Sequence, residues 1–132
     1  MIGVDTNILA RHVLQDDPKW SEAASRFLRD VCSPARPGYV NPVTLAELVW
    51  LLRQQPGYDR QRLVALIEAL LADENLVVGS PSAVVAALDA FRQGPAGFAD
   101  CLVAELNAEA GASPTYSIDK KALKHTRFAP LP

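Results

Sequence analysis

Four acidic residues interrupt apolar stretches of this chain: Asp5, Glu47, Asp100 and Asp119. Carboxylates gathered in one place repel one another, which raises their pKa values or destabilises the fold. A divalent cation removes that cost, and oxygen ligands without histidine or cysteine suit Mg²⁺ or Mn²⁺ better than zinc. If the fold brings these four side chains together, they form a metal site.

Three of the four acids also have a simpler interpretation, as local helix-start residues. Asp5 and Asp119 each follow a short apolar segment and could cap the helix that comes next. Asp100 lies in the first turn of a predicted helix, where a negative charge favours the positive end of the helix dipole by about 0.3–1 kcal/mol. Each of these interpretations is as plausible as the functional one when taken alone. One shared acidic pocket explains all of the acids together.

Glu47 has a different local alternative. It follows Thr44 by three residues, which matches a capping box at a helix start. That alternative weakens if Asn41 is the cap and Pro42 the first helical residue, because Glu47 then lies inside a helix that is apolar nearly all round. We expect such a helix to lie in the interior, where an unpaired carboxylate costs several kcal/mol, on the order of 3–5 kcal/mol.

Short apolar segments alternate with segments of helical periodicity from end to end, which favours an α/β fold with a mostly parallel central sheet in three layers. Ligands of such sheets bind beyond the carboxyl ends of the strands. The predicted strands are 2–4, 39–40, 76–78 and 115–118, with a final edge segment at 126–132. The predicted helices are 6–14, 19–31, 42–55, a helix after the cap Asp59, 81–91, 98–110 and a short one around Leu123.

The composition indicates one ordered domain, residues 1–132. Of the 132 residues, 49% are apolar and 21% are charged, which argues against disorder. No apolar run approaches the ~18 residues of a membrane span, and no signal peptide is visible. Cys32 and Cys101 have neither disulfide-framework nor metal-ligand spacing. We therefore expect a cytoplasmic protein without a membrane partner.

Four motifs in order resemble those of PIN-domain ribonucleases, and more closely the VapC toxins of bacterial toxin–antitoxin pairs. They are "GVDTNIL", "TLAELVWLL", "FADCLVAELN" and "SIDKKALK", and the resemblance covers nearly the whole chain. It implies a Rossmann-like sheet and a Mg²⁺-dependent endoribonuclease, with Mn²⁺ as a possible substitute. It also implies a homodimer and a small VapB-like antitoxin as partners.

The resemblance also implies roles for individual residues. Asp5 and Asp100 would bind the metal directly or through water, and Glu47 and Asp119 would complete the acidic site. Small polar residues that orient these carboxylates or a water would be Thr6, Asn7 and Ser117. Ser117 stands where the family commonly has threonine and keeps the hydroxyl. Thr6 and Asn7 could equally just open the first helix.

Hydrolysis of a phosphodiester needs an activated water and stabilised charge on the phosphate and leaving group, which carboxylate-held metal ions supply. The net charge of −2 does not exclude RNA, because with four acids neutralised 13 basic residues face 11 acidic ones. Basic residues also cluster after Asp119, in "KKALKHTR". The candidate RNA-binding residues are Lys120, Lys121, Lys124 and, more weakly, Arg11.

Three other classes fit parts of the pattern. A receiver-like signalling domain would need paired acids after the first strand and an aspartate after a middle strand, and neither is present. A haloacid-dehalogenase-type phosphatase would need an aspartate where this chain has Asn7. A PIN-like domain without catalysis that only binds a partner remains an alternative, although all four acids are present.

Overall fold

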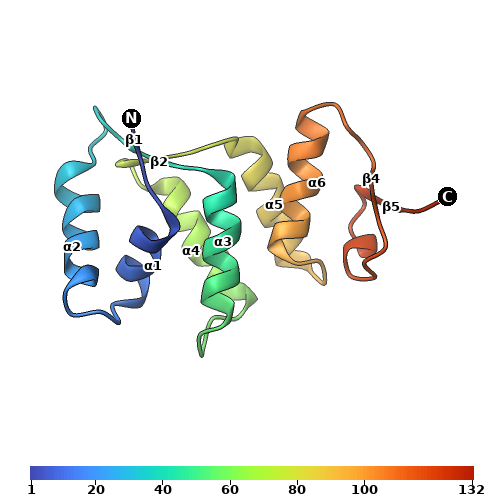
Figure 1. Ribbon diagram of the computed structural model, residues 1–132. Coiled ribbons are helices and arrows are strands. Elements are labelled where there is room, and N and C mark those ends of the chain that lie inside the picture. The colour runs from blue at the N-terminus through green and yellow to red at the C-terminus, as the bar shows by residue number, and fades with distance from the viewer. The chain divides into compact units, whose positions relative to one another are not determined.

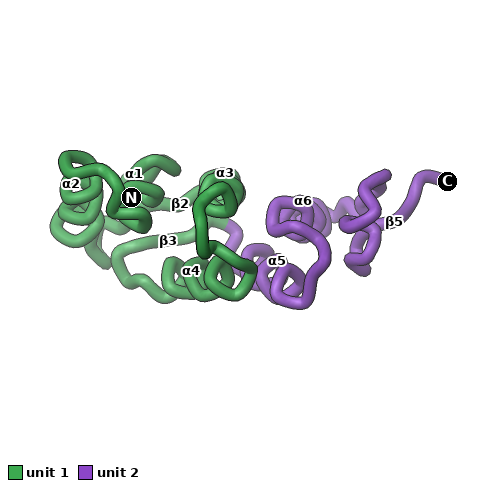
Figure 2. The backbone as a smooth tube through the Cα atoms, turned by 90° about the horizontal axis from the view of Figure 1, so that it is seen from below, with its two compact units in different colours: residues 1–79 green, residues 80–132 purple.

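Strands and helices alternate along the computed structural model, which describes all of residues 1–132 (Figure 1). The chain divides into two compact units, residues 1–79 and 80–132, which Figure 2 shows in different colours. No helix combines the length and the apolar character that a membrane span requires.

The first unit is built on a three-stranded parallel sheet with the strand order β1-β2-β3. In this sheet Ile2 lies opposite Gly38, and Gly38 lies opposite Leu76. The strands are β1 (Ile2–Gly3), β2 (Gly38–Val40) and β3 (Leu76–Val78). The helices are α1 (Thr6–Leu14), α2 (Trp20–Arg26), a π-helical turn η1 (Phe27–Val31), α3 (Pro42–Arg53) and α4 (Arg60–Ala72).

One face of this sheet carries the core. Val4, Val40 and Val78 are buried side by side, whereas Val77, which points to the opposite face, is 40% exposed. A strand order that follows the chain order, with right-handed crossovers, places the connecting helices on the same face. The helices therefore bury that face of the sheet within this unit.

Local capping signals set the starts of the two longest helices of this unit. The Asn41 side chain accepts a hydrogen bond from the Val43 backbone N–H at 2.8 Å, and Pro42 opens α3. Asp59 does the same for α4, accepting from the Arg62 N–H at 2.8 Å. Because Asn41 caps α3, Thr44 and Glu47 do not form the capping box that their spacing allows.

Two expectations about helices are wrong in part. The predicted helix over 19–31 is α-helical only to Arg26 and ends in a π turn, in which the Cys32 N–H donates to the Phe27 carbonyl. Apolar spacing over one turn does not distinguish the two kinds of turn. Helix α3 is not enclosed either, because Val43 and Trp50 are 64% and 69% exposed.

The second unit packs two helices together and ends in a small parallel sheet. Its elements are α5 (Pro81–Gln93), α6 (Phe98–Glu109), β4 (Thr115–Ser117), a short 3₁₀ helix η2 (Ala122–Lys124) and β5 (Phe128–Pro130). The rings of Phe91 and Phe98 meet edge to face at 5.7 Å between centroids and join α5 to the start of α6. Asn107 donates to the Thr115 hydroxyl at 3.0 Å, which ties α6 to β4.

The alternation of helices with parallel strand pairs in both units confirms the predicted α/β class and agrees with a Rossmann-like three-layer fold. The assignment of residues 1–132 to one domain stays a prediction.

Candidate metal and nuclease site

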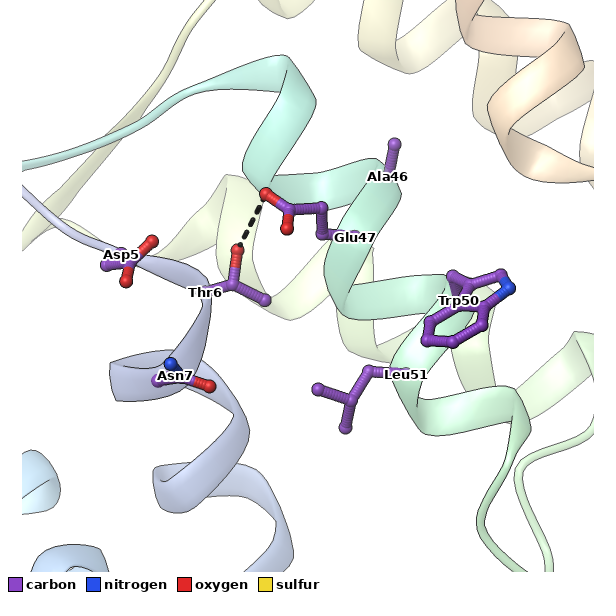
Figure 3. A pocket seen from close by; sticks show the side chains of 7 residues that line it. All are labelled: Asp5, Thr6, Asn7, Ala46, Glu47, Trp50 and Leu51. Atoms are coloured by element: carbon purple, nitrogen blue, oxygen red, sulfur yellow. Dashed lines mark hydrogen bonds between the residues drawn. The ribbon is translucent and has the colours of Figure 1, made fainter.

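The parallel pairing of β1 with β2 explains how Asp5 and Glu47 come into one pocket. Parallel neighbours end at the same edge of a sheet. Helices α1 and α3, which follow β1 and β2, therefore both begin at that edge and pack against each other. The pocket between them has a volume of about 400 Å³. Figure 3 shows its lining, with Asp5, Thr6 and Asn7 from one segment and Ala46, Glu47, Trp50 and Leu51 from α3.

The Asp5 carboxylate is not used to cap α1. Asp5 stands at the N-cap position with extended backbone angles, but its side chain accepts no hydrogen bond from the helix N-terminus. Only its backbone carbonyl does so, from the Ile8 N–H at 3.1 Å. The side chain is exposed in the pocket. The capping interpretation of Asp5 therefore does not account for its carboxylate.

Thr6 holds Glu47 in place within the same pocket. The Thr6 hydroxyl, which is buried, donates to Glu47 Oε1 at 3.3 Å (Figure 3). Glu47 itself is exposed, so the expectation of a carboxylate deep inside a buried helix is wrong. Position 47 lies on the face of α3 that is open to solvent. Asn7 is also exposed and lines the pocket without a side-chain hydrogen bond to it.

Asp100 and Asp119 lie close enough in the second unit to interact through their charges. Burial raises the pKa of Asp100 above its ordinary value, and the negative charge of Asp119 raises it further. A carboxylate that only favoured the helix dipole would have a lowered pKa. The environment of Asp100 therefore opposes its charge, through burial and the neighbouring carboxylate.

Asp119 combines a local structural role with a free oxygen. Its Oδ1 accepts from the backbone N–H groups of Lys121 and Ala122 at 2.8 and 3.0 Å and so holds the turn that leads into η2, whose N-cap residue is Lys121. Its Oδ2 accepts neither bond and is open to a ligand. The Ser117 hydroxyl accepts from the Asp119 N–H at 3.0 Å and fixes the backbone at the end of β4.

The candidate RNA-binding residues differ in how free they are. Lys120, Lys121 and Lys124 are exposed after Asp119 and form no ion pair. Arg11 Nη1 instead contacts both carboxylate oxygens of Asp16, at 3.0 and 3.1 Å. The lysines therefore remain available for phosphate groups, and Arg11 is the weaker candidate.

The acids thus form two pairs, Asp5 with Glu47 and Asp100 with Asp119, one in each unit. No group of three or more metal-ligating side chains lies close enough together to hold an ion. Sequence reasoning missed Trp50, which lines the first pocket and is exposed. Its position three residues after Glu47, on the same helical face, is the signal that could have found it.

A family model of the PIN domain matches residues 2–126, which is nearly the whole chain. No curated protein matches the chain. PIN domains are generally nucleases, and these nucleases generally use divalent metal ions.

Proposed function

Because the chain belongs to the PIN-domain family, we propose that it is a Mg²⁺-dependent endoribonuclease that acts in the cytoplasm as the toxin of a toxin–antitoxin pair. We propose further that Asp5, Glu47, Asp100 and Asp119 are its catalytic and metal-binding residues, with Mn²⁺ able to replace Mg²⁺. The observation that carries the proposal is the PIN-domain match over residues 2–126, together with the pocket that Asp5 and Glu47 line in the structure.

The donor set fits a hard divalent ion. All four acids offer carboxylate oxygens, and neither histidine accompanies them at a zinc-ligand spacing. Two of the carboxylates have oxygens that no helix cap occupies, on Asp5 and on Asp119. When bound, a divalent ion supplies a more acidic water and positive charge beside the phosphate.

The remaining residues have roles that their contacts support. Thr6 would keep Glu47 aimed into the pocket through its 3.3 Å hydrogen bond. Ser117 would hold the backbone that presents Asp119. Asn7 would hydrogen-bond a water or the substrate at the pocket wall. Lys120, Lys121 and Lys124 would bind phosphates of the RNA along the strand.

The toxin role rests on the resemblance of four motifs to VapC toxins. It brings two proposed protein partners, a short VapB-like antitoxin and a second copy of this chain. An arginine or lysine of the antitoxin would neutralise the acidic site in place of the cation.

Substitution of Asp100 by Asn tests the nuclease. Asn is nearly isosteric and removes the negative charge that holds a divalent ion, so we expect metal-dependent cleavage to fall by several orders of magnitude, about 10³-fold or more. A helix-start charge alone would cost about 0.3–1 kcal/mol of stability and little activity. Cleavage of total cellular RNA by the purified protein in Mg²⁺, with mapped cleavage sites, measures the effect.

Asp89→Asn is the matched control. Asp89 lies on α5, is exposed and pairs only with Arg92 at 2.9 Å, so its loss should leave cleavage unchanged. Wild-type cleavage must also stop in EDTA and return with Mg²⁺ or Mn²⁺. If Asp100→Asn cleaves within about threefold of wild type in saturating Mg²⁺, the proposed site is wrong.

A further inference from the structure

An exposed tryptophan shares the pocket with Asp5 and Glu47. Trp50 lies one helical turn after Glu47 on α3 and is 69% exposed. Figure 3 shows the Glu47 side chain reaching toward Thr6 and the indole of Trp50 lying further along the same helix. An aromatic surface and two carboxylates therefore line one pocket of about 400 Å³.

The ring of Trp50 has no partner within the chain. The other tryptophan, Trp20, is 56% exposed, but the Lys19 ammonium lies over its ring at 4.8 Å. No cation or aromatic ring covers Trp50, and the Gln54 side chain donates a hydrogen bond to its backbone carbonyl at 3.3 Å. A large apolar ring left bare beside charged groups leaves hydrophobic surface in water, which a flat ligand would cover.

We propose that Trp50 stacks on the unpaired base of a nucleotide next to the scissile phosphate of single-stranded RNA. This inference rests on the proposed nuclease and adds a positioning residue to it. The carboxylates repel the phosphate except through a bound cation, whereas the base is the uncharged, flat part of the nucleotide. Every base presents a π-face, so an aromatic side chain holds it without selecting a sequence.

The position of Trp50 also selects unpaired RNA over a duplex. Bases within an A-form helix are stacked on their neighbours, and single strands can splay a base onto an aromatic side chain. Residues three apart on a helix have Cβ atoms about 5–6 Å apart. A base on Trp50 would thus hold its own or the adjoining phosphate beside Glu47 and Asp5.

Substitutions of Trp50 test the stacking on an RNA oligonucleotide that spans the mapped cleavage site. Loss of one base–aromatic stack lowers affinity by about five- to 150-fold, so Trp50→Leu should lower kcat/KM by that factor, mainly through KM. Trp50→Phe keeps an aromatic face and should stay within about threefold of wild type. Trp20→Leu is the matched control and should cleave as wild type does.

An abasic ribonucleotide beside the cleavage site separates stacking from a structural role. If Trp50 holds that base, the abasic site lowers kcat/KM of the wild type by about as much as the Trp50→Leu substitution does. The abasic site should then cause no further loss of kcat/KM in the Trp50→Leu variant. The proposal would be overturned if the abasic site lowered kcat/KM equally in the wild type and in Trp50→Leu. Full activity of Trp50→Leu on the unmodified RNA would also overturn it. So would a Trp50→Leu defect that follows a change in oligomeric state by sedimentation, since Trp50 would then contact a second copy.

The two proposals fail in different ways. Wild-type protein that cleaves no RNA in Mg²⁺ refutes the nuclease and the stacking with it. Wild-type protein that cleaves RNA while Trp50→Leu cleaves it equally well refutes the stacking alone.

Discussion

Asp100 is the residue whose surroundings most clearly oppose its ionisation. Its pKa is raised above 3.8, first by burial and then by the charge of Asp119. A carboxyl with a raised pKa in the folded state favours folding when protonated. Its stabilising contribution is present below pH about 3.8 and is lost as the pH rises through the folded-state value. The metal-free protein should therefore lose stability in this range because of Asp100.

The Asp119→Asn variant tests the second of these causes. Asn keeps the Oδ1 acceptor for Lys121 and Ala122, so the turn survives and only the charge is lost. We expect the pKa of Asp100 to move down toward its ordinary value and the loss of stability with pH to shrink. An NMR titration of the Asp100 carboxyl carbon in EDTA measures the pKa of Asp100. Denaturant unfolding across the pH range of that titration measures how stability falls as the pH rises.

Asp89→Asn again serves as the control, because Asp89 is exposed and pairs with Arg92. An Asp100 titration that is unchanged in Asp119→Asn would mean that burial alone opposes its charge, and the two acids would not share an ion.

At the scale of elements, strand β2 is packed closely between its neighbours in the sheet that positions Asp5 and Glu47. A Cβ at Gly38 would lie 2.8 Å from Val4 Cγ2, 3.0 Å from Leu76 Cδ2 and 3.1 Å from Cys32 Sγ. These neighbours are buried and cannot all move aside. Gly38→Ala should therefore destabilise the protein by about 1–3 kcal/mol, as overpacking does.

Gly3→Ala is the matched change on the neighbouring strand. A Cβ at Gly3 meets nothing within 4 Å, so the substitution should be close to neutral. Urea denaturation of the two variants makes the comparison. Equal stabilities would show that β2 is not packed between its neighbours as described.

Local sequence signals predicted the bounds and caps of the helices well. They did not predict how the helices are oriented or what each carboxylate contacts. Helix α1 was expected over 6–14 and spans Thr6–Leu14, and the caps Asn41 and Asp59 act as expected. The orientation of α3 could not be predicted, because apolar residues on every side leave no hydrophobic stripe to choose a face. The partners of each carboxylate depend on which strands pair and where chain segments pack, and a single sequence does not carry that information.

At the scale of the whole molecule, the proposed toxin role predicts an effect of the protein on cell growth. An endoribonuclease without its antitoxin would degrade cellular RNA, so we expect induced expression of this chain alone to arrest growth. Asp100→Asn, which keeps the fold, should be harmless at the same protein level. Growth curves and immunoblots of both variants check this.

If a short adjacent gene encodes the proposed antitoxin, co-expression of that gene should restore growth. Normal growth of cells that accumulate folded wild-type protein would contradict the toxin role, although it would leave in vitro cleavage possible.

The free Asp5 carboxylate has a consequence for inheritance. Because this side chain is exposed and caps nothing, a single codon change to Asn removes the proposed chemistry and leaves every packing contact of the sheet in place. Descendants of this gene can therefore lose the proposed activity without losing the fold. A lineage that lost the proposed nuclease activity in this way would keep producing a folded protein.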